Sequence, residues 1–98
     1  MQQISIEIYF KHSLKDSIVD MLFEDGFDDF FCVPCSKYAS SMLLMSPKEQ
    51  VSGRQEYGIF RIFLSEEDKA KIVINKLLQA FGKEDLRIYT HLVDCVHS

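Results

Sequence analysis

The chain has 98 residues, with 15 acidic and 11 basic side chains and a formal charge of -4, and 47% of its residues are hydrophobic. This composition predicts one compact domain over residues 1–98 and excludes collagen-like, coiled-coil and disordered chains. The bases are scattered among acids along the sequence, which argues against nucleic-acid binding because phosphate neutralisation needs a clustered basic face. The apolar runs are too short for a membrane span and the first residues lead into a strand pattern, so we expect a cytoplasmic protein.

The first part of the chain predicts a strand and then a helix. Residues 4–10 alternate between apolar and polar side chains, the period of a strand with one buried face. Ser13, with Asp16 three residues later, predicts a capped helix start, and Gly26 predicts its left-handed stop. Apolar residues between them recur at helical spacing: Leu14, Ile18, Met21 and Leu22.

A second strand is predicted at residues 30–38, which are rich in aromatic and branched side chains. Pro34 removes a hydrogen-bond donor from this strand, so we expect it at a sheet edge or a bulge and the strand to be irregular. The serines and the proline that flank the apolar cluster of residues 42–45 predict a loop from Ser40 to Lys48.

The second half repeats the order of the first. Residues 57–64 alternate with apolar side chains on both faces, which predicts a third strand. Ser65 and Asp68 predict another capped helix that ends at Gly82. Residues 86–92 alternate again and predict the fourth strand.

Two similar strand-helix-strand halves predict an α+β fold, the ferredoxin-like βαββαβ sandwich, in which both helices pack on one face of an antiparallel four-stranded sheet. The other sheet face would then carry apolar side chains that are poorly suited to water: Tyr9, Ile59, Phe63, Tyr89 and Val93. We therefore expect a homo-oligomer that covers this face.

The run Glu49-Gln50-Val51-Ser52-Gly53-Arg54, followed by residues 60–64 and an acidic helix start, resembles a small PII-like family. Further matches, such as the Phe81-Gly82 helix stop, extend the resemblance over nearly the whole chain. Members of this family are uncharacterised domains often encoded beside heavy-metal efflux pumps. The resemblance implies the fold of the PII nitrogen regulators and the CutA-type divalent-cation-tolerance proteins, a trimer whose sheets face its axis, and ligands in the clefts between subunits.

The same run contains the candidate ligand-binding residues. Arg54 could donate two hydrogen bonds to a carboxylate or phosphate, and Gly53 would let a ligand approach the backbone closely. Glu49 and Gln50 could add polar contacts in the same cleft. In the alternative interpretation, Arg54 only pairs with an acid and Gly53 only permits a turn or bulge.

The identity of the ligand does not follow from these residues. The turn at residues 82–85 places two acids beside Lys83, which works against a cradle for a triphosphate. The acids therefore argue against adenine-nucleotide binding, and the sequence leaves the cofactor unknown.

A weaker alternative is a soft or borderline metal site formed by Cys32, Cys35, Cys95 and His97. The Cys32 and Cys35 side chains would face opposite ways on an extended strand, so a shared site needs Pro34 to bend the chain. The other interpretation is that the three cysteines are reduced and structural, and no disulfide is predicted from their odd number.

The sequence contains no nucleophile elbow, zincin helix or Walker loop, so we expect a protein that is not an enzyme. The predicted function is that of a PII-like regulatory protein, which binds a small ligand between subunits and contacts a protein partner through the Ser40–Lys48 loop. The alternatives are a metal-binding protein of the tolerance type and a passive interaction module without a ligand.

Overall fold

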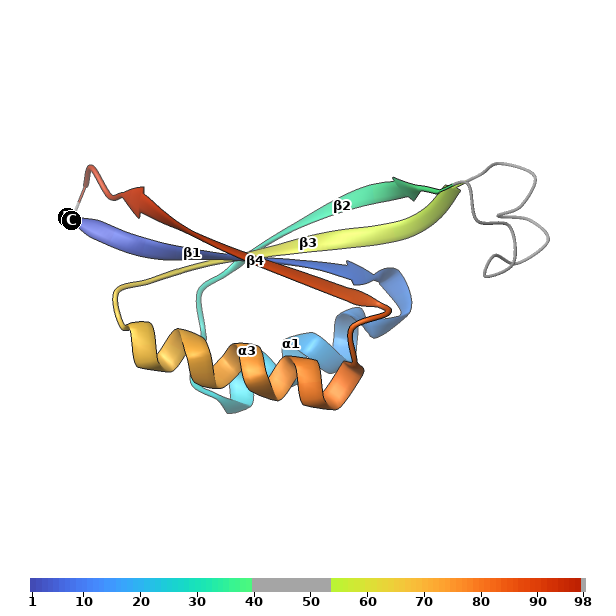
Figure 1. Ribbon diagram of the computed structural model, residues 1–98, viewed down its shortest axis with the longest axis horizontal. Coiled ribbons are helices and arrows are strands. Elements are labelled where there is room, and N and C mark those ends of the chain that lie inside the picture. The colour runs from blue at the N-terminus through green and yellow to red at the C-terminus, as the bar shows by residue number, and fades with distance from the viewer. Residues whose placement is uncertain (40–53, 98) are drawn as a thin grey trace.

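The computed structural model describes residues 1–39 and 54–97. In this part of the chain, two helices lie against one face of a four-stranded sheet (Figure 1). The elements in chain order are β1 (Gln2–Lys11), the short 3-10 helix η1 (His12–Leu14), α1 (Lys15–Glu24), β2 (Phe31–Tyr38), β3 (Arg54–Leu64), α3 (Glu67–Phe81) and β4 (Leu86–Asp94).

The strands lie in the order β2-β3-β1-β4, and every neighbouring pair is antiparallel. The long central strands β1 and β3 pair from Ile4 with Leu64 to Lys11 with Tyr57. Both helices lie on the same side of the sheet (Figure 1). The predicted ferredoxin-like fold is therefore confirmed.

The core lies between the sheet and the helices, because one face of each strand and one stripe of each helix is apolar. Its fully buried side chains come from both layers: Ile6, Ile8, Phe10, Phe60, Ile62, Ile18, Leu22, Val73 and Leu77. The rings of Phe10 and Phe60 stack with their centroids 4.5 Å apart. Gly58 lies opposite Phe10 in the sheet, and a Cβ atom at position 58 would lie 2.5 Å from Phe10 Cζ. Glycine is thus needed at position 58 to make room for the Phe10 ring.

Both predicted N-terminal helix caps are wrong. The N-cap residue of α1 is Leu14 and that of α3 is Glu66, and neither helix has a side-chain capping hydrogen bond. η1 occupies the position where Ser13 was expected to begin a helix, and α3 begins one residue later than a Ser65 cap would allow. The acidic residues in the first turn of each helix still interact favourably with its dipole.

The two predicted helix stops are confirmed. Gly26 and Gly82 have φ angles of 88° and 77°, in the region that residues with a Cβ rarely adopt. The Gly82 amide donates a hydrogen bond to the Leu78 carbonyl and so closes the last turn of α3.

β2 is an edge strand, as Pro34 predicted, but it is not irregular. Its pairing with β3 runs without a bulge from Phe31 opposite Arg61 to Tyr38 opposite Arg54. An edge strand uses only one side of its backbone for pairing, so a proline can be accommodated without breaking the register. β3 also begins three residues earlier than the expected Tyr57, because the pairing with β2 extends to Arg54.

The predicted loop from Ser40 to Lys48 lies outside the described residues. Within the described ranges, no helix combines the length and hydropathy that crossing a bilayer requires.

Candidate functional site

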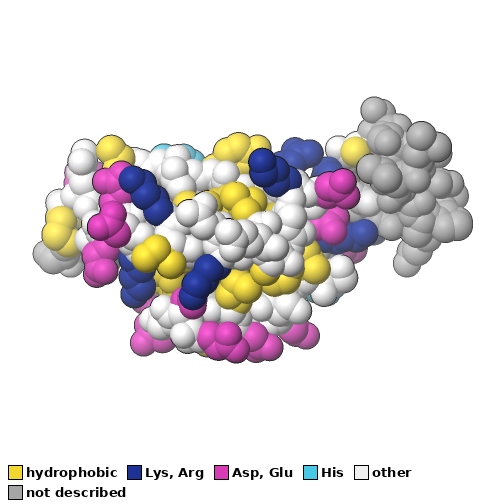
Figure 2. All heavy atoms as spheres, turned by 60° about the horizontal axis from the view of Figure 1, so that its bottom comes forward, with side chains coloured by type: hydrophobic (Ala, Val, Ile, Leu, Met, Phe, Trp, Pro, Cys, Tyr) yellow, Lys and Arg dark blue, Asp and Glu magenta, His cyan; other side chains and the backbone are white. Residues whose placement is uncertain are grey.

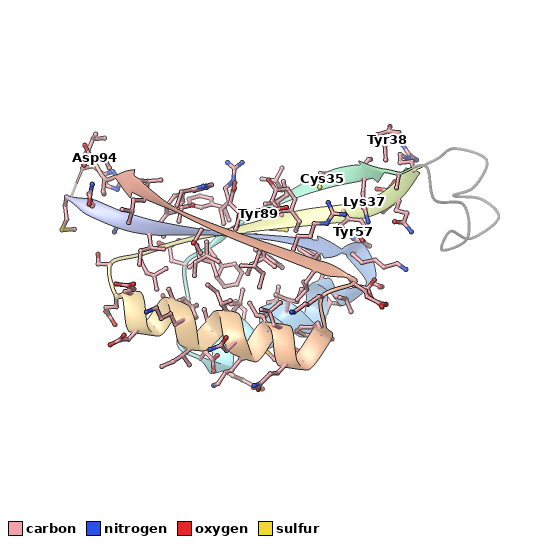
Figure 3. All side chains as sticks on the ribbon, viewed as in Figure 1. Cys35, Lys37, Tyr38, Tyr57, Tyr89 and Asp94 are labelled. Atoms are coloured by element: carbon pink, nitrogen blue, oxygen red, sulfur yellow. The ribbon has the colours of Figure 1, made fainter. Side chains whose placement is uncertain are left out.

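The sheet face that the helices leave uncovered is called the open face. It is formed by alternate residues of the four strands, which the register places side by side: Ser5, Glu7, Tyr9 and Lys11 of β1, Phe31, Val33, Cys35 and Lys37 of β2, Gln55, Tyr57, Ile59, Arg61 and Phe63 of β3, and Arg87, Tyr89, His91 and Val93 of β4. In Figure 3, Cys35, Tyr57 and Tyr89 are labelled on this side of the sheet.

One end of the open face is apolar. Phe31 is 60% exposed and Phe63 is 43% exposed, and their rings meet edge to face with centroids 6.3 Å apart. Val33 and Tyr89 extend the apolar surface toward the middle of the sheet and are also exposed. Contiguous exposed patches of large apolar side chains are typical of contact surfaces.

A partly buried carboxylate joins three strands at the middle of the open face. Glu7 Oε2 accepts a hydrogen bond from Arg61 Nε at 3.0 Å, and Glu7 Oε1 lies 3.2 Å from His91 Nε2. The Glu7 side chain is only 14% exposed, whereas those of Arg61 and His91 are about half exposed. Both oxygens of this carboxylate are therefore engaged, which fixes Arg61 and His91 on the sheet.

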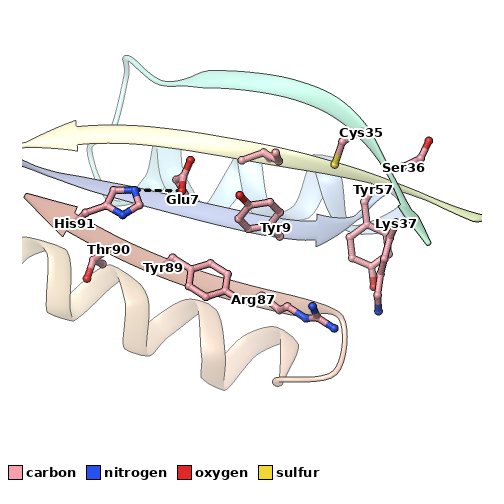
Figure 4. A pocket seen from close by; sticks show the side chains of 11 residues that line it. Glu7, Tyr9, Cys35, Ser36, Lys37, Tyr57, Arg87, Tyr89, Thr90 and His91 are labelled. Carbon is pink, nitrogen blue, oxygen red and sulfur yellow. Dashed lines mark ion pairs between the residues drawn. The ribbon is translucent and has the colours of Figure 1, made fainter. Parts of the chain in front are cut away.

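A groove of about 600 Å³ runs along the open face beside this carboxylate (Figure 4). Its walls come from β1, β2, β3 and β4, and three of its lining side chains are tyrosines. Tyr9 and Tyr89 meet edge to face with centroids 5.6 Å apart. The lining residues are Glu7, Tyr9, Cys35, Ser36, Lys37, Tyr57, Ile59, Arg87, Tyr89, Thr90 and His91.

The end of the groove away from Glu7 and His91 is basic. Lys37 and Arg87 lie on its two outer strands, and Figure 4 places both side chains at the same end. The Lys37 ammonium lies 5.1 Å from the centre of the Tyr57 ring, within the range of a cation–π contact. This end adjoins Tyr38 and Arg54, the residues at which the chain enters and leaves the segment 40–53.

Cys35 lies in the wall of this groove. Burial raises the pKa of its thiol, and the nearby Cys32 and Glu56 charges raise it further. The thiol therefore stays protonated at neutral pH and is a poor nucleophile, because the thiolate is the reactive form.

Arg54 is the one described member of the predicted ligand set. It begins β3, is exposed, and lies 3.4 Å from Glu56 Oε1. Glu49, Gln50 and Gly53 lie outside the described residues, so whether the four side chains share a cleft stays a prediction. The pairing of Arg54 with a nearby acid also keeps the alternative interpretation open.

The structure does not bring the four predicted metal ligands together within one chain. Cys32 and Cys35 are three residues apart on β2 and therefore lie on opposite faces of the sheet. Pro34 does not bend the strand so as to bring them together. Cys95 and His97 do lie together at the end of β4, with Sγ 3.8 Å from Nδ1. Among the described residues, no three of the side chains that favour metals are grouped closely enough to hold an ion.

The groove was not predicted from the sequence as a site. Strand alternation placed Tyr9 and Tyr89 on the uncovered face, but nothing in the sequence indicated that Lys37 and Arg87 would lie at one end of it. Glu7 and His91 are 84 residues apart and meet only because β1 and β4 pair. Alternation within a strand predicts the face that each side chain occupies, but it does not predict which residue of a distant strand lies beside it.

Comparison with known families gives one match that covers almost the entire chain. The profile of a family described as proteins of unknown function (DUF3240) matches residues 1–97. A search among curated proteins finds no match.

Solved structures with the same fold include PII-like proteins. The nitrogen regulatory PII-like protein CPII from Thiomonas intermedia K12, bound to ADP, AMP and bicarbonate, superimposes with a TM-score of 0.76 at 13% identity, over 100% of this chain and 97% of that one. A DUF3240 family protein from Shewanella baltica OS155 gives 0.65 at 16% identity, over 99% and 92% of the two chains. The B. subtilis GlnK–ATP complex gives 0.64 at 13% identity, over 95% and 84%. The predicted PII-like fold is thus confirmed.

The central carboxylate supplies a test of how the open face is held together. We expect Glu7→Gln to lower the free energy of unfolding by about 1–2 kcal/mol, because Gln cannot provide the charge that Arg61 and His91 contact. The loss stays within this range because solvent partly screens both partners. Urea unfolding at one fixed protein concentration measures this change.

The matched control is Glu56→Gln, which removes the carboxylate of the exposed ion pair between Arg54 and Glu56 on β3. It should change the free energy of unfolding by less than about 0.5 kcal/mol. Equal effects of the two substitutions would show that Glu7 has no special role.

Proposed function

Because this chain belongs to the DUF3240 family and has a PII-like fold, we propose that it is a regulatory protein that assembles through its open face and binds a small ligand between subunits. The assembly is a trimer, as the family resemblance implies, and it is located in the cytoplasm, as expected from the short apolar runs of the sequence. Arg54, together with Glu49, Gln50 and Gly53, contacts the ligand, and the Ser40–Lys48 loop transmits binding to a protein partner. A regulatory role rather than catalysis agrees with the PII-like relatives.

The observation that carries this proposal is the apolar end of the open face. Phe31, Val33, Phe63 and Tyr89 are about half exposed, so complete burial would give each of them roughly half of the about 1.5–3 kcal/mol that a fully exposed apolar side chain gains. A subunit contact supplies that burial. The basic end of the same face adjoins Arg54, so assembly would form a polar cleft next to the loop that contacts the partner.

Ligand binding would be transmitted by a shift in population. A ligand that binds better to one arrangement of the loop increases the fraction of subunits in that arrangement. The change in the free energy of partner binding then equals the coupling free energy between the ligand site and the partner site.

Assembly is tested by introducing a charge into the apolar end. We expect the wild-type chain to sediment as a trimer at micromolar concentration and Phe63→Glu to sediment as a monomer, because a carboxylate would be buried without a partner in the subunit contact. Ile72→Glu is the matched control, since Ile72 is 58% exposed on the outer side of α3. A well-folded wild-type monomer would rule out the proposed assembly.

Ligand binding is tested by thermal denaturation against a panel of nucleotides and small anions. A ligand that binds only the folded protein raises its Tm, by an amount that increases with ligand concentration. We expect at least one compound to raise the Tm and Arg54→Ala to abolish the shift. A panel without any effect on the wild-type protein would count against a ligand-dependent regulator.

A metal-binding function is the second candidate, and the short distance between Cys95 and His97 favours it. A thiolate and an imidazole suit zinc or a soft ion such as copper(I), and a neighbouring subunit could supply further ligands. We expect a reduced preparation to bind either metal near one equivalent per subunit and Cys95→Ser to lose it. Cys32→Ser should keep the metal if Cys95 and His97 hold it without β2. Titration of the wild-type protein without any metal uptake would exclude this candidate.

A further inference from the structure

The charges of the chain are sorted between the two sides of the sheet. The paired strand positions on the open face include four permanent cations, Lys11, Lys37, Arg61 and Arg87, and a single carboxylate, Glu7, which is a net charge of +3 over these positions. Asp29 and Asp94 lie beside Phe31 and Phe63 at the apolar end, and neither lines the groove that holds Lys37 and Arg87. The whole chain has a formal charge of -4. The remaining residues of the chain therefore carry a net charge of -7. Figure 2 views the helix side, where acidic side chains lie along the bottom and at the left end of the view, with some basic side chains between them.

This excess of cations opposes the assembly proposed above. Packing the open face of one subunit against another brings like charges together in a region with less water. Two like charges 4 Å apart repel by about 1 kcal/mol in water and by about 4 kcal/mol near a protein surface. The apolar contacts at the other end of the face have to overcome this repulsion.

Glu7 neutralises only one of the four cations. Its oxygens are occupied by Arg61 and His91, at the middle of the sheet. Within residues 1–39 and 54–97, neither Lys37 nor Arg87 forms an ion pair with a carboxylate. Covering them without a counter-charge would cost several kcal/mol per ion.

The groove between these two cations has the dimensions and donors of an anion site. β2 and β4 are separated by two strands, which places their backbones about 14 Å apart at the usual strand spacing. The register also sets Lys37 four residues further along the sheet than Arg87. Their long side chains therefore approach this end of the groove from two corners rather than from directly opposite positions. The hydroxyl groups of Tyr9, Tyr57 and Tyr89 add donors along the walls. Ammonium, guanidinium and hydroxyl donors together match the acceptor oxygens of an oxyanion.

We propose that a multivalent oxyanion binds in the groove between Lys37 and Arg87 and allows the open faces of two subunits to associate. This inference rests on the assembly part of the proposed function and adds the ligand chemistry that assembly requires. The anion supplies the negative charge that the open face lacks. Anion binding and assembly are then linked, so each strengthens the other.

The test measures subunit association by sedimentation at constant ionic strength, with chloride replaced by 10 mM inorganic phosphate. For the wild-type chain we expect phosphate to lower the dissociation constant of the assembly at least tenfold. In the double variant Lys37→Gln/Arg87→Gln, association should be independent of phosphate and at least as tight as that of the wild-type chain in chloride, because the repulsion is gone.

The matched control is Lys15→Gln/Lys71→Gln, which removes two exposed lysines from the helices and so makes the same change in net charge. This control should keep the full response to phosphate. An equal loss of the response in both double variants would overturn the inference, because net charge rather than the groove would then explain it.

The remaining outcomes separate this inference from the proposed function. Tight assembly of the wild-type chain in chloride, unchanged by phosphate, would overturn the anion site and leave the proposed assembly intact. A chain that stays monomeric in every salt would overturn both.

Phenyl phosphate provides a further arm, because the tyrosine walls should favour a phosphate attached to a ring. A stronger effect than that of inorganic phosphate supports a larger phosphorylated ligand, and an equal effect supports the free ion.

Discussion

The alternation of side chains along β1 is the constraint on which the rest of the structure depends. Its apolar positions face the helices, and the positions between them, Glu7 and Tyr9 among others, face the open side. Because β1 pairs with β3 on one side and β4 on the other, the same division is imposed across the sheet. A shift of one residue would bury Glu7 in the core and expose Ile6 and Ile8.

The open face combines features that would conflict in an isolated subunit. Phe31 and Phe63 favour burial, whereas Lys37 and Arg87, which form no ion pair with the described carboxylates, resist it. A contact surface that is apolar at one end and basic at the other can respond to a ligand, because an anion changes only the unfavourable contribution. Such a surface is suited to a protein whose assembly or partner binding is regulated.

Local sequence signals predicted some elements correctly and others not. The apolar stripe of α3 and the stops at Gly26 and Gly82 were identified, because each depends on residues close together in the chain. The Ser13 and Ser65 caps were wrong, since each helix begins after the predicted cap and uses the charges of its first turn. The regular pairing of β2 was missed because Pro34 was expected to distort the strand, whereas an edge strand pairs through only one side of its backbone and can accommodate a proline within a regular register.

The sequence by itself determined the fold class and the apolar character of the uncovered sheet face, since both follow from the periodicity of neighbouring residues. Only the tertiary structure decided where the charges lie. The bases are scattered along the chain, yet Lys37 and Arg87 reach the same end of one groove, and Glu7 joins Arg61 to His91. Strand order and pairing bring these distant residues together. The alternation within one strand fixes which face a side chain occupies, but it does not fix which residue of another strand lies beside it.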